Sequence, residues 1–314
     1  MWSDRAGARV GLIALLTIVY VIAGKLGLAL AYVHANASAV WPPTGIALAA
    51  LLVFGGRVWP AVLLGALIVN LTTAGTVVTS AAIAGGNTLE ALIGAALVNR
   101  FAGGSRAFDS VRGILKFAVL AAGIATTISA TVGTTTLAVA GLAQWSEYER
   151  IWLTWWLGDA TGALVLAPVL VLAAVDPAMR WNVRKLGEAL ILLAGLAITG
   201  IAVFQRRDPP PTTFLCVPFP LWAAFRFGRR EAAIATLLLS VLAVWGAVRG
   251  VGLFARTSMN DSLLLLQVFM GGLTVTCLIV ATVVSESQRV ERDSRSSFSA
   301  RRRSKTSRSK ARTA

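Results

Sequence analysis

Long apolar runs recur along this chain, and they constrain its fold more than any other feature. A helix of about 20 apolar residues crosses the hydrocarbon core of a bilayer. The runs are continuous rather than alternating, which argues against a membrane β-barrel and predicts an all-α polytopic transmembrane bundle. Ten segments can be drawn, at 10–30, 37–54, 58–74, 77–99, 114–140, 151–175, 187–204, 212–226, 231–248 and 262–284.

The second and eighth segments are the least regular of the ten. Both are short or carry proline, at Trp41-Pro42-Pro43 and at Val217-Pro218-Phe219-Pro220. Proline removes a backbone donor and interrupts a helix, so either segment could be broken or re-entrant. We therefore predict eight to ten spans, and prefer ten.

Charge is scarce in this chain and strongly biased in sign. Charged residues make up 14% of the sequence against 56% hydrophobic ones, and the net charge is +15. An ordinary soluble domain carries about 25% charged residues, and a disordered chain is poor in apolar ones. With ten spans and both termini inside, 23 of the 29 Lys and Arg residues fall on the cytoplasmic side. This positive-inside bias predicts that both ends of the chain lie in the cytoplasm.

The sequence divides at residue 284 into a membrane part and a tail. Residues 1–284 are expected to form one integral-membrane domain, and residues 285–314 a basic, Ser- and Arg-rich cytoplasmic tail. The start of this tail could continue the last helix, but beyond about 295 its composition predicts disorder. The basic tail is typical of a flank that fixes orientation and touches anionic lipid. A nucleic-acid-binding role is poorly supported.

Two carboxylates fall inside the predicted spans, where ionisable groups are costly and suggest a function. Glu90 lies in mid-span, three residues after Asn87 and on the same helix face. Asp159 lies four residues after Trp155 and is flanked by Gly158 and Gly162 (positions that let another helix approach closely). Two interpretations stay open: the carboxylates hold the bundle together through hydrogen bonds, or they line an outward-facing cavity that binds a ligand or cation.

Other polar positions have simpler interpretations. Lys25 could pair with a buried carboxylate or extend to the outer interface. Trp41 and Pro42 open a span, as an anchored helix entry or as a rigid wall above a cavity. Asn70 and the polar residues of the fifth segment are expected to bond between helices; the latter are Ser129, Thr131, Thr134, Thr135 and Thr136.

Residues for catalysis or metal binding are few. His34 is the sole histidine, and Cys216 and Cys277 lie in apolar runs without metal-ligand spacing. No P-loop, G-x-G-x-x-G or G-x-S-x-G motif occurs. We therefore expect neither catalytic residues nor a cofactor or metal site.

In order and spacing, six motifs resemble the membrane-associated sensor family known as MASE, type one, over residues 10–285. They are Trp41-Pro42-Pro43-Thr44-Gly45-Ile46-Ala47-Leu48, Arg57-Val58-Trp59-Pro60, Gly86-Asn87-Thr88-Leu89-Glu90-Ala91, Ile128-Ser129-Ala130-Thr131-Val132-Gly133, Trp155-Trp156-Leu157-Gly158-Asp159-Ala160-Thr161-Gly162 through Pro168, and Pro218-Phe219-Pro220-Leu221 through Arg226-Phe227-Gly228-Arg229-Arg230.

The resemblance implies a bacterial sensory input domain of about eight spans that is not itself an enzyme. Such a module usually precedes a histidine kinase, a diguanylate cyclase with a GGDEF motif or a phosphodiesterase with an EAL motif. No such string and no phosphoacceptor histidine follow the membrane part here. We expect a stand-alone sensor, a truncated reading of a longer sensor gene, or a module whose role has changed.

The sequence thus predicts a sensor that passes a signal through its last span to a cytoplasmic output. The hypothetical ligand-binding residues are Trp41, Pro42, Asn87, Glu90, Trp155 and Asp159. Expected partners are the lipid bilayer, an unknown small-molecule ligand, a histidine kinase or a cyclic-di-GMP enzyme as output, and a second copy of the chain. The rival interpretation is a secondary transporter whose membrane carboxylates bind the substrate.

Overall fold

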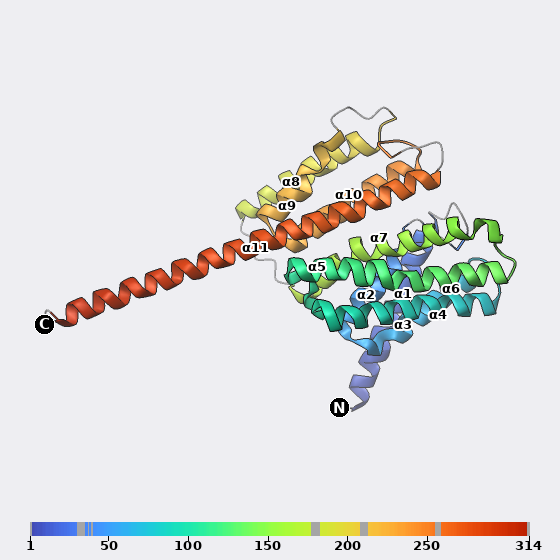
Figure 1. The fold of residues 1–314 in the computed structure, drawn as a ribbon, viewed down its shortest axis with the longest axis horizontal. Helices are drawn as coiled ribbons and strands as arrows, with labels where there is room; N and C mark the ends of the chain where they lie inside the picture. Colours follow the sequence, from blue (N-terminus) through green and yellow to red (C-terminus); the bar gives the residue numbers. More distant parts are fainter. Residues whose placement is uncertain are drawn as a thin grey trace.

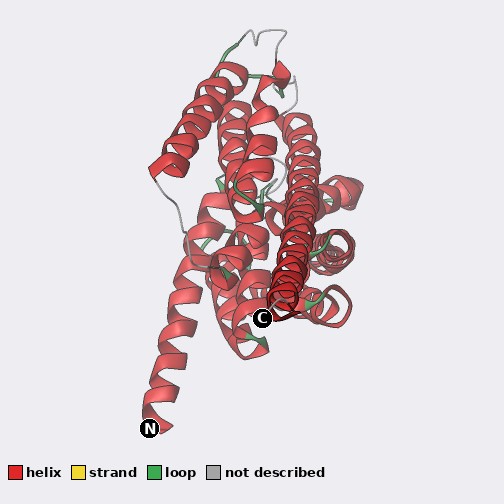
Figure 2. Cartoon of the chain, turned by 90° about the vertical axis from the view of Figure 1, so that its left-hand side faces the viewer, coloured by secondary structure: helices red, strands yellow, loops and turns green. Residues whose placement is uncertain are grey.

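The computed structural model describes residues 2–29, 35–36, 38, 40–176, 183–207, 213–254 and 259–312. Within these residues all regular secondary structure is helical, and no strand is drawn (Figure 2). The all-α prediction is confirmed. His34 lies outside the described residues.

The helices follow the ten predicted segments closely. Their bounds, in chain order, are α1 Trp2–Leu28, α2 Pro42–Phe54, α3 Trp59–Leu71, α4 Val77–Leu97, α5 Val111–Phe117, α6 Thr126–Val139, α7 Tyr148–Val175, α8 Val183–Phe204, α9 Pro218–Arg226, α10 Arg229–Val248 and α11 Met259–Arg312. Two π-helical stretches extend or join them: Val98–Ala102 lengthens α4, and Ala118–Ala125 makes α5 and α6 one continuous helix.

Seven of the described helical stretches are long and apolar enough to cross a membrane. The shorter apolar helices are α2, α3 and α9, and α2 and α9 are the two that the prolines singled out. At about 1.5 Å per residue, the 13 residues of α2 span only about 20 Å. The chain is therefore a polytopic helical bundle, and ten complete crossings stay a prediction.

Two layers of helices make up the bundle (Figure 1). One contains α1 to α7 and has its core around the α2–α7 and α4–α6 pairs. The other contains α8, α9 and α10 and packs against α11. Leucine, isoleucine and valine side chains on the outer faces of α1 and α8 are exposed, as expected of surfaces that meet lipid.

The last helix leaves the bundle and runs far beyond it (Figure 1). Helix α11 continues to Arg312, through the tail for which the sequence led us to expect disorder. The division of the chain at residue 284 stays a prediction.

Arginines at several turns bond to groups that lie far away in the sequence. Arg9 donates to the carbonyl of Arg57, and Arg230 donates to the carbonyl of Asp176. Arg229 joins the layers through a 2.6 Å ion pair with Asp109. These turns are the ones that the charge bias assigned to one side of the membrane.

Candidate functional site: a buried acidic centre

Asp159 lies at the meeting point of three helices and is completely buried. The Thr44 hydroxyl of α2 donates to its Oδ1 at 3.0 Å. The Ser129 hydroxyl of α6 lies 2.8 Å from its Oδ2. Hydroxyl donors thus hold the Asp159 carboxylate of α7 from two sides. Burying it without partners would cost several kcal/mol.

Ser129 connects this carboxylate to two further side chains. Its Oγ lies 2.9 Å from Asn87 Oδ1 of α4 and accepts the indole N–H of Trp155 at 3.0 Å. The Trp155 ring occupies the space where Gly133 has no side chain, since a Cβ at that position would overlap the ring. One serine therefore joins α4, α6 and α7 around a shared network.

Glu90 differs from Asp159 in having no hydrogen-bond partner among the described residues. Its side chain is 1% exposed, and neither carboxylate oxygen is paired. It lies within electrostatic range of Asp159 and close to Ser129 and Thr44. The buried Nδ2 of Asn87 is also unpaired. Native proteins rarely leave buried polar atoms unsatisfied, so such a cluster requires an explanation.

Tyr20 brings α1 to the same centre. It is 3% exposed, its side chain interacts with those of Trp41 and Asn87, and it lies within electrostatic range of both carboxylates. We define the acidic centre as Tyr20, Trp41, Thr44, Asn87, Glu90, Ser129, Trp155 and Asp159.

Glycines allow the backbones around the centre to touch. The amide of Trp41 donates to the carbonyl of Gly158 at 3.2 Å. A Cβ at Gly162 would overlap the carbonyl of Trp41, and one at Gly45 would overlap the carbonyl of Gly162. The predicted close approach at Gly158 and Gly162 is found, and the neighbour is the start of α2.

Five of the six predicted site residues come together in the acidic centre: Trp41, Asn87, Glu90, Trp155 and Asp159. The sixth, Pro42, begins α2 and lines an apolar groove instead. Lys25 donates to Val69, Thr72 and Thr73, at the end of α3, and has no described carboxylate partner. Its pairing with a buried carboxylate is therefore not seen among the described residues, and its extension to the outer interface stays a prediction.

Sequence reasoning missed Thr44 and Tyr20 as members of the centre. Thr44 lies three residues after Trp41 in a motif already noted, so its helix face was a usable signal. Tyr20 lies in a continuous apolar run, and nothing there indicates which face meets the bundle. Ser129 was expected to bond between helices, although its partners could not be named.

A metal site is not indicated by the described residues. No group of three His, Cys, Asp or Glu side chains gathers in the part searched. The donors of the acidic centre are carboxylate, hydroxyl and amide oxygens, which suit a small hard cation or a hydrogen-bond donor.

The fold and this centre define a multi-pass helical membrane protein with ionisable groups buried between its helices. Comparison with protein families gives a more specific answer, because the MASE1 model matches residues 10–288, and the chain belongs to the MASE1 family. MASE1 is a membrane sensory domain rather than a catalytic one. The match of the family model confirms the resemblance drawn from the motifs.

A curated relative supplies a further comparison. The "Probable diguanylate cyclase DgcE" of Escherichia coli (strain K12) is 27% identical over 201 residues, which cover 62% of this chain and 17% of the relative. The chain thus matches less than a fifth of that protein's length. No solved structure matches the chain.

Proposed function

We propose that this MASE1 domain is the sensory input of a cyclic-di-GMP signalling system and that its stimulus acts at the acidic centre. A relative described as a probable diguanylate cyclase supports a cyclase as the output, in preference to a histidine kinase. Because the match covers 17% of that relative, the output activity is proposed for a partner or continuation and not for the residues described.

The unpaired carboxylate of Glu90 carries the assignment of the site. A purely structural carboxylate would be satisfied as Asp159 is, by donors from neighbouring helices. Glu90 is equally buried, and although Ser129 and Thr44 lie close to it, no donor makes a hydrogen bond of good geometry to either of its oxygens. A cation or a hydrogen-bond donor that reaches Glu90 would relieve this cost, and it would favour the helix arrangement in which it binds best.

Helix α7 offers a route from the centre to the output. It carries Asp159 and also packs against α11, where Leu164 lies over Gly271. Farther along, the Thr282 hydroxyl of α11 lies 3.4 Å from the carbonyl of Phe108, which also accepts from Arg229. Displacement of α7 would therefore move the start of the helix that continues to Arg312.

We propose that the protein lies in the inner membrane with both termini in the cytoplasm. This orientation is supported by the positive-inside bias of the sequence, which assigns Arg9, Arg57, Arg229 and Arg230 to the cytoplasmic side. Basic residues near short loops are retained on the cytoplasmic side.

The test is a fusion of the full chain to a diguanylate cyclase domain, with cyclic di-GMP measured in cells. Glu90→Gln and Asp159→Asn are expected to lock the output at one level, high or low, at normal expression. Glu147→Gln, an exposed carboxyl at the start of α7, is the matched control and should leave the output unchanged. Wild-type output from both centre variants would contradict the site.

A transporter is the second candidate, because α2 and α9 are short and begin at prolines, a feature of transporter binding sites. Substrate flux into proteoliposomes that Glu90→Gln abolishes would favour it over the sensor.

A further inference from the structure

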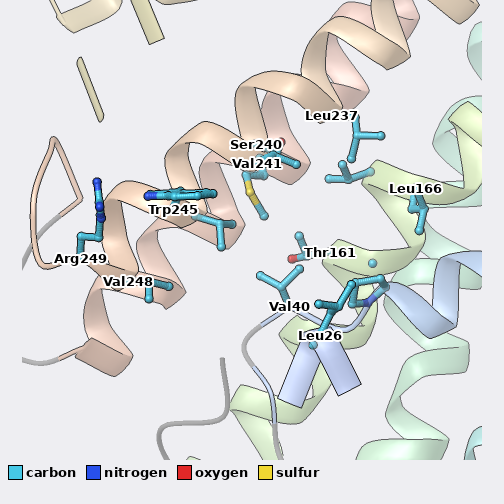
Figure 3. Close-up of a pocket in the computed structure, with 16 residues that line it drawn as sticks. Leu26, Val40, Thr161, Leu166, Leu237, Ser240, Val241, Trp245, Val248 and Arg249 are labelled. Carbon is cyan, nitrogen blue, oxygen red and sulfur yellow. The ribbon is translucent and has the colours of Figure 1, made fainter. Parts of the chain in front are cut away.

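An apolar groove lies between the two helix layers, beside the entry to α2. Its volume is about 590 Å³, within the range of small-molecule sites. One wall comes from α1, α7 and the entry to α2, and the other from α10 and α11. Figure 3 shows Leu26, Val40 and Thr161 facing Val241 and Trp245 across the space.

The residues that line the groove favour an apolar ligand. Of the sixteen lining residues, only Thr161, Ser240, Arg249 and, through its indole N–H, Trp245 carry polar groups in their side chains, and none is acidic. The Ser240 hydroxyl already donates to the carbonyl of Thr236 in its own helix at 2.7 Å. A polar ligand would lose its hydration without gaining partners, whereas a hydrocarbon chain would lose nothing.

The single charge lies at one end of the groove. Arg249 follows the last residue of α10, and its guanidinium lies 5.6 Å from the centroid of the Trp245 ring. It is exposed and has no ion pair with a described residue. Tryptophan and arginine together are typical of the level of lipid headgroups. From Leu237 to Arg249 the helix rises by about 18 Å, roughly half of a bilayer.

We propose that this groove binds an anionic phospholipid of the leaflet on the Arg249 side. The acyl chain lies along α10 toward Leu237, and the phosphate binds the Arg249 guanidinium. This site is separate from the acidic centre, and the inference does not depend on the proposed function. Gly162 of α7 and Met270 of α11 both line the groove. The bound acyl chain therefore lies between α7 and α11.

Native mass spectrometry of the full chain tests this site. The protein is purified in mild detergent and titrated with phosphatidylglycerol or with phosphatidylcholine. We expect one phosphatidylglycerol to be retained in preference to phosphatidylcholine. Arg249→Ala should weaken that retention about tenfold, the usual worth of one charge-assisted contact. Arg150→Ala, an exposed arginine at the start of α7 outside the groove, is the matched control and should retain it.

A second variant tests the acyl-chain half of the site. Val241 lines the groove and is 52% exposed, so Val241→Trp fills the space without disturbing the core. It should abolish retention of the lipid while leaving the size-exclusion profile unchanged. Equal retention of both lipids by the wild type, or retention unaffected by Arg249→Ala and Val241→Trp, would overturn the proposal.

Discussion

The acidic centre and the layer of α8 to α10 differ in how their buried hydroxyls bond. In α10 and α11, Ser240 and Thr274 bond within their own helix, to the carbonyls of Thr236 and Met270, whereas Thr282 reaches Phe108 of the other layer. Around the acidic centre hydroxyls bond between helices, as Thr44 and Ser129 do to Asp159. A hydroxyl that serves its own helix leaves packing unspecified, whereas one that bridges helices fixes their arrangement. The comparison assigns the specificity of packing to the surroundings of the acidic centre, where we propose that the stimulus acts.

The largest effect is expected where the backbones of α2 and α7 touch. Gly162→Ala would place a Cβ against the carbonyl of Trp41, which cannot rotate away. We expect a loss of about 3 kcal/mol or more of stability, at the upper end for overpacking. The amount of folded protein after heating, measured by size-exclusion chromatography, checks this.

Gly85→Ala is the control for that substitution, because a Cβ there meets nothing within 4 Å. It should be neutral or slightly stabilising, since alanine is the better helix former. Equal stability of the two variants would show that the α2–α7 contact is looser than described.

Ser129→Ala tests the difference between the layers directly. It removes the hydroxyl that lies between Asp159, Asn87 and the Trp155 indole, and we expect a loss of about 1–3 kcal/mol. Ser240→Ala removes a bond inside one helix and should cost about 0.5 kcal/mol or less. Unfolding in mixed micelles measures the loss of stability of both variants. A larger loss for Ser240→Ala than for Ser129→Ala would show that the hydroxyl between helices does not contribute more than the one within a helix.

A smaller effect is expected at Arg229, whose ion pair with Asp109 joins the two layers. Arg229 bonds both Asp109 and the carbonyl of Phe108, and its side chain is 28% exposed. Arg106 reaches the same carboxylate with a side chain that is 79% exposed. We expect Arg229→Ala to lower stability by about 1 kcal/mol and Arg106→Ala to change it little, because solvent screens exposed pairs. Equal thermal shifts for the two would argue against a tie between the layers.

The smallest change in stability is expected for Glu90→Gln. No hydrogen bond of good geometry to a described residue is lost, and a buried carboxyl is replaced by an amide of nearly the same shape. Stability should stay the same or rise, by about 1 kcal/mol at most. A thermal shift as unfavourable as that of Ser129→Ala would mean that Glu90 has a structural role.

The apolar pattern predicted the helices well because bilayer thickness sets their length. The spacing of Trp155 to Asp159 and of Asn87 to Glu90 correctly placed each pair on one helix face. Sequence could not predict that Thr44 meets Asp159, since the partner is 115 residues away and depends on how α2 packs on α7. The π-helical stretch at Ala118–Ala125, whose Gly123 carbonyl accepts the Trp156 indole, also left no periodic signal.

The central claim is that a change at Glu90 reaches α11 through α7. Cross-linking of a Leu164→Cys, Gly271→Cys pair measures that contact directly, since Leu164 Cδ1 lies 3.1 Å from the Cβ position of Gly271. With Cys216 and Cys277 replaced, oxidation rates are compared in membranes with Glu or Gln at position 90. If a change at Glu90 reaches α11, the rate changes several-fold for Glu90→Gln and stays the same for Glu147→Gln. An identical rate for Glu and Gln at position 90 would contradict it.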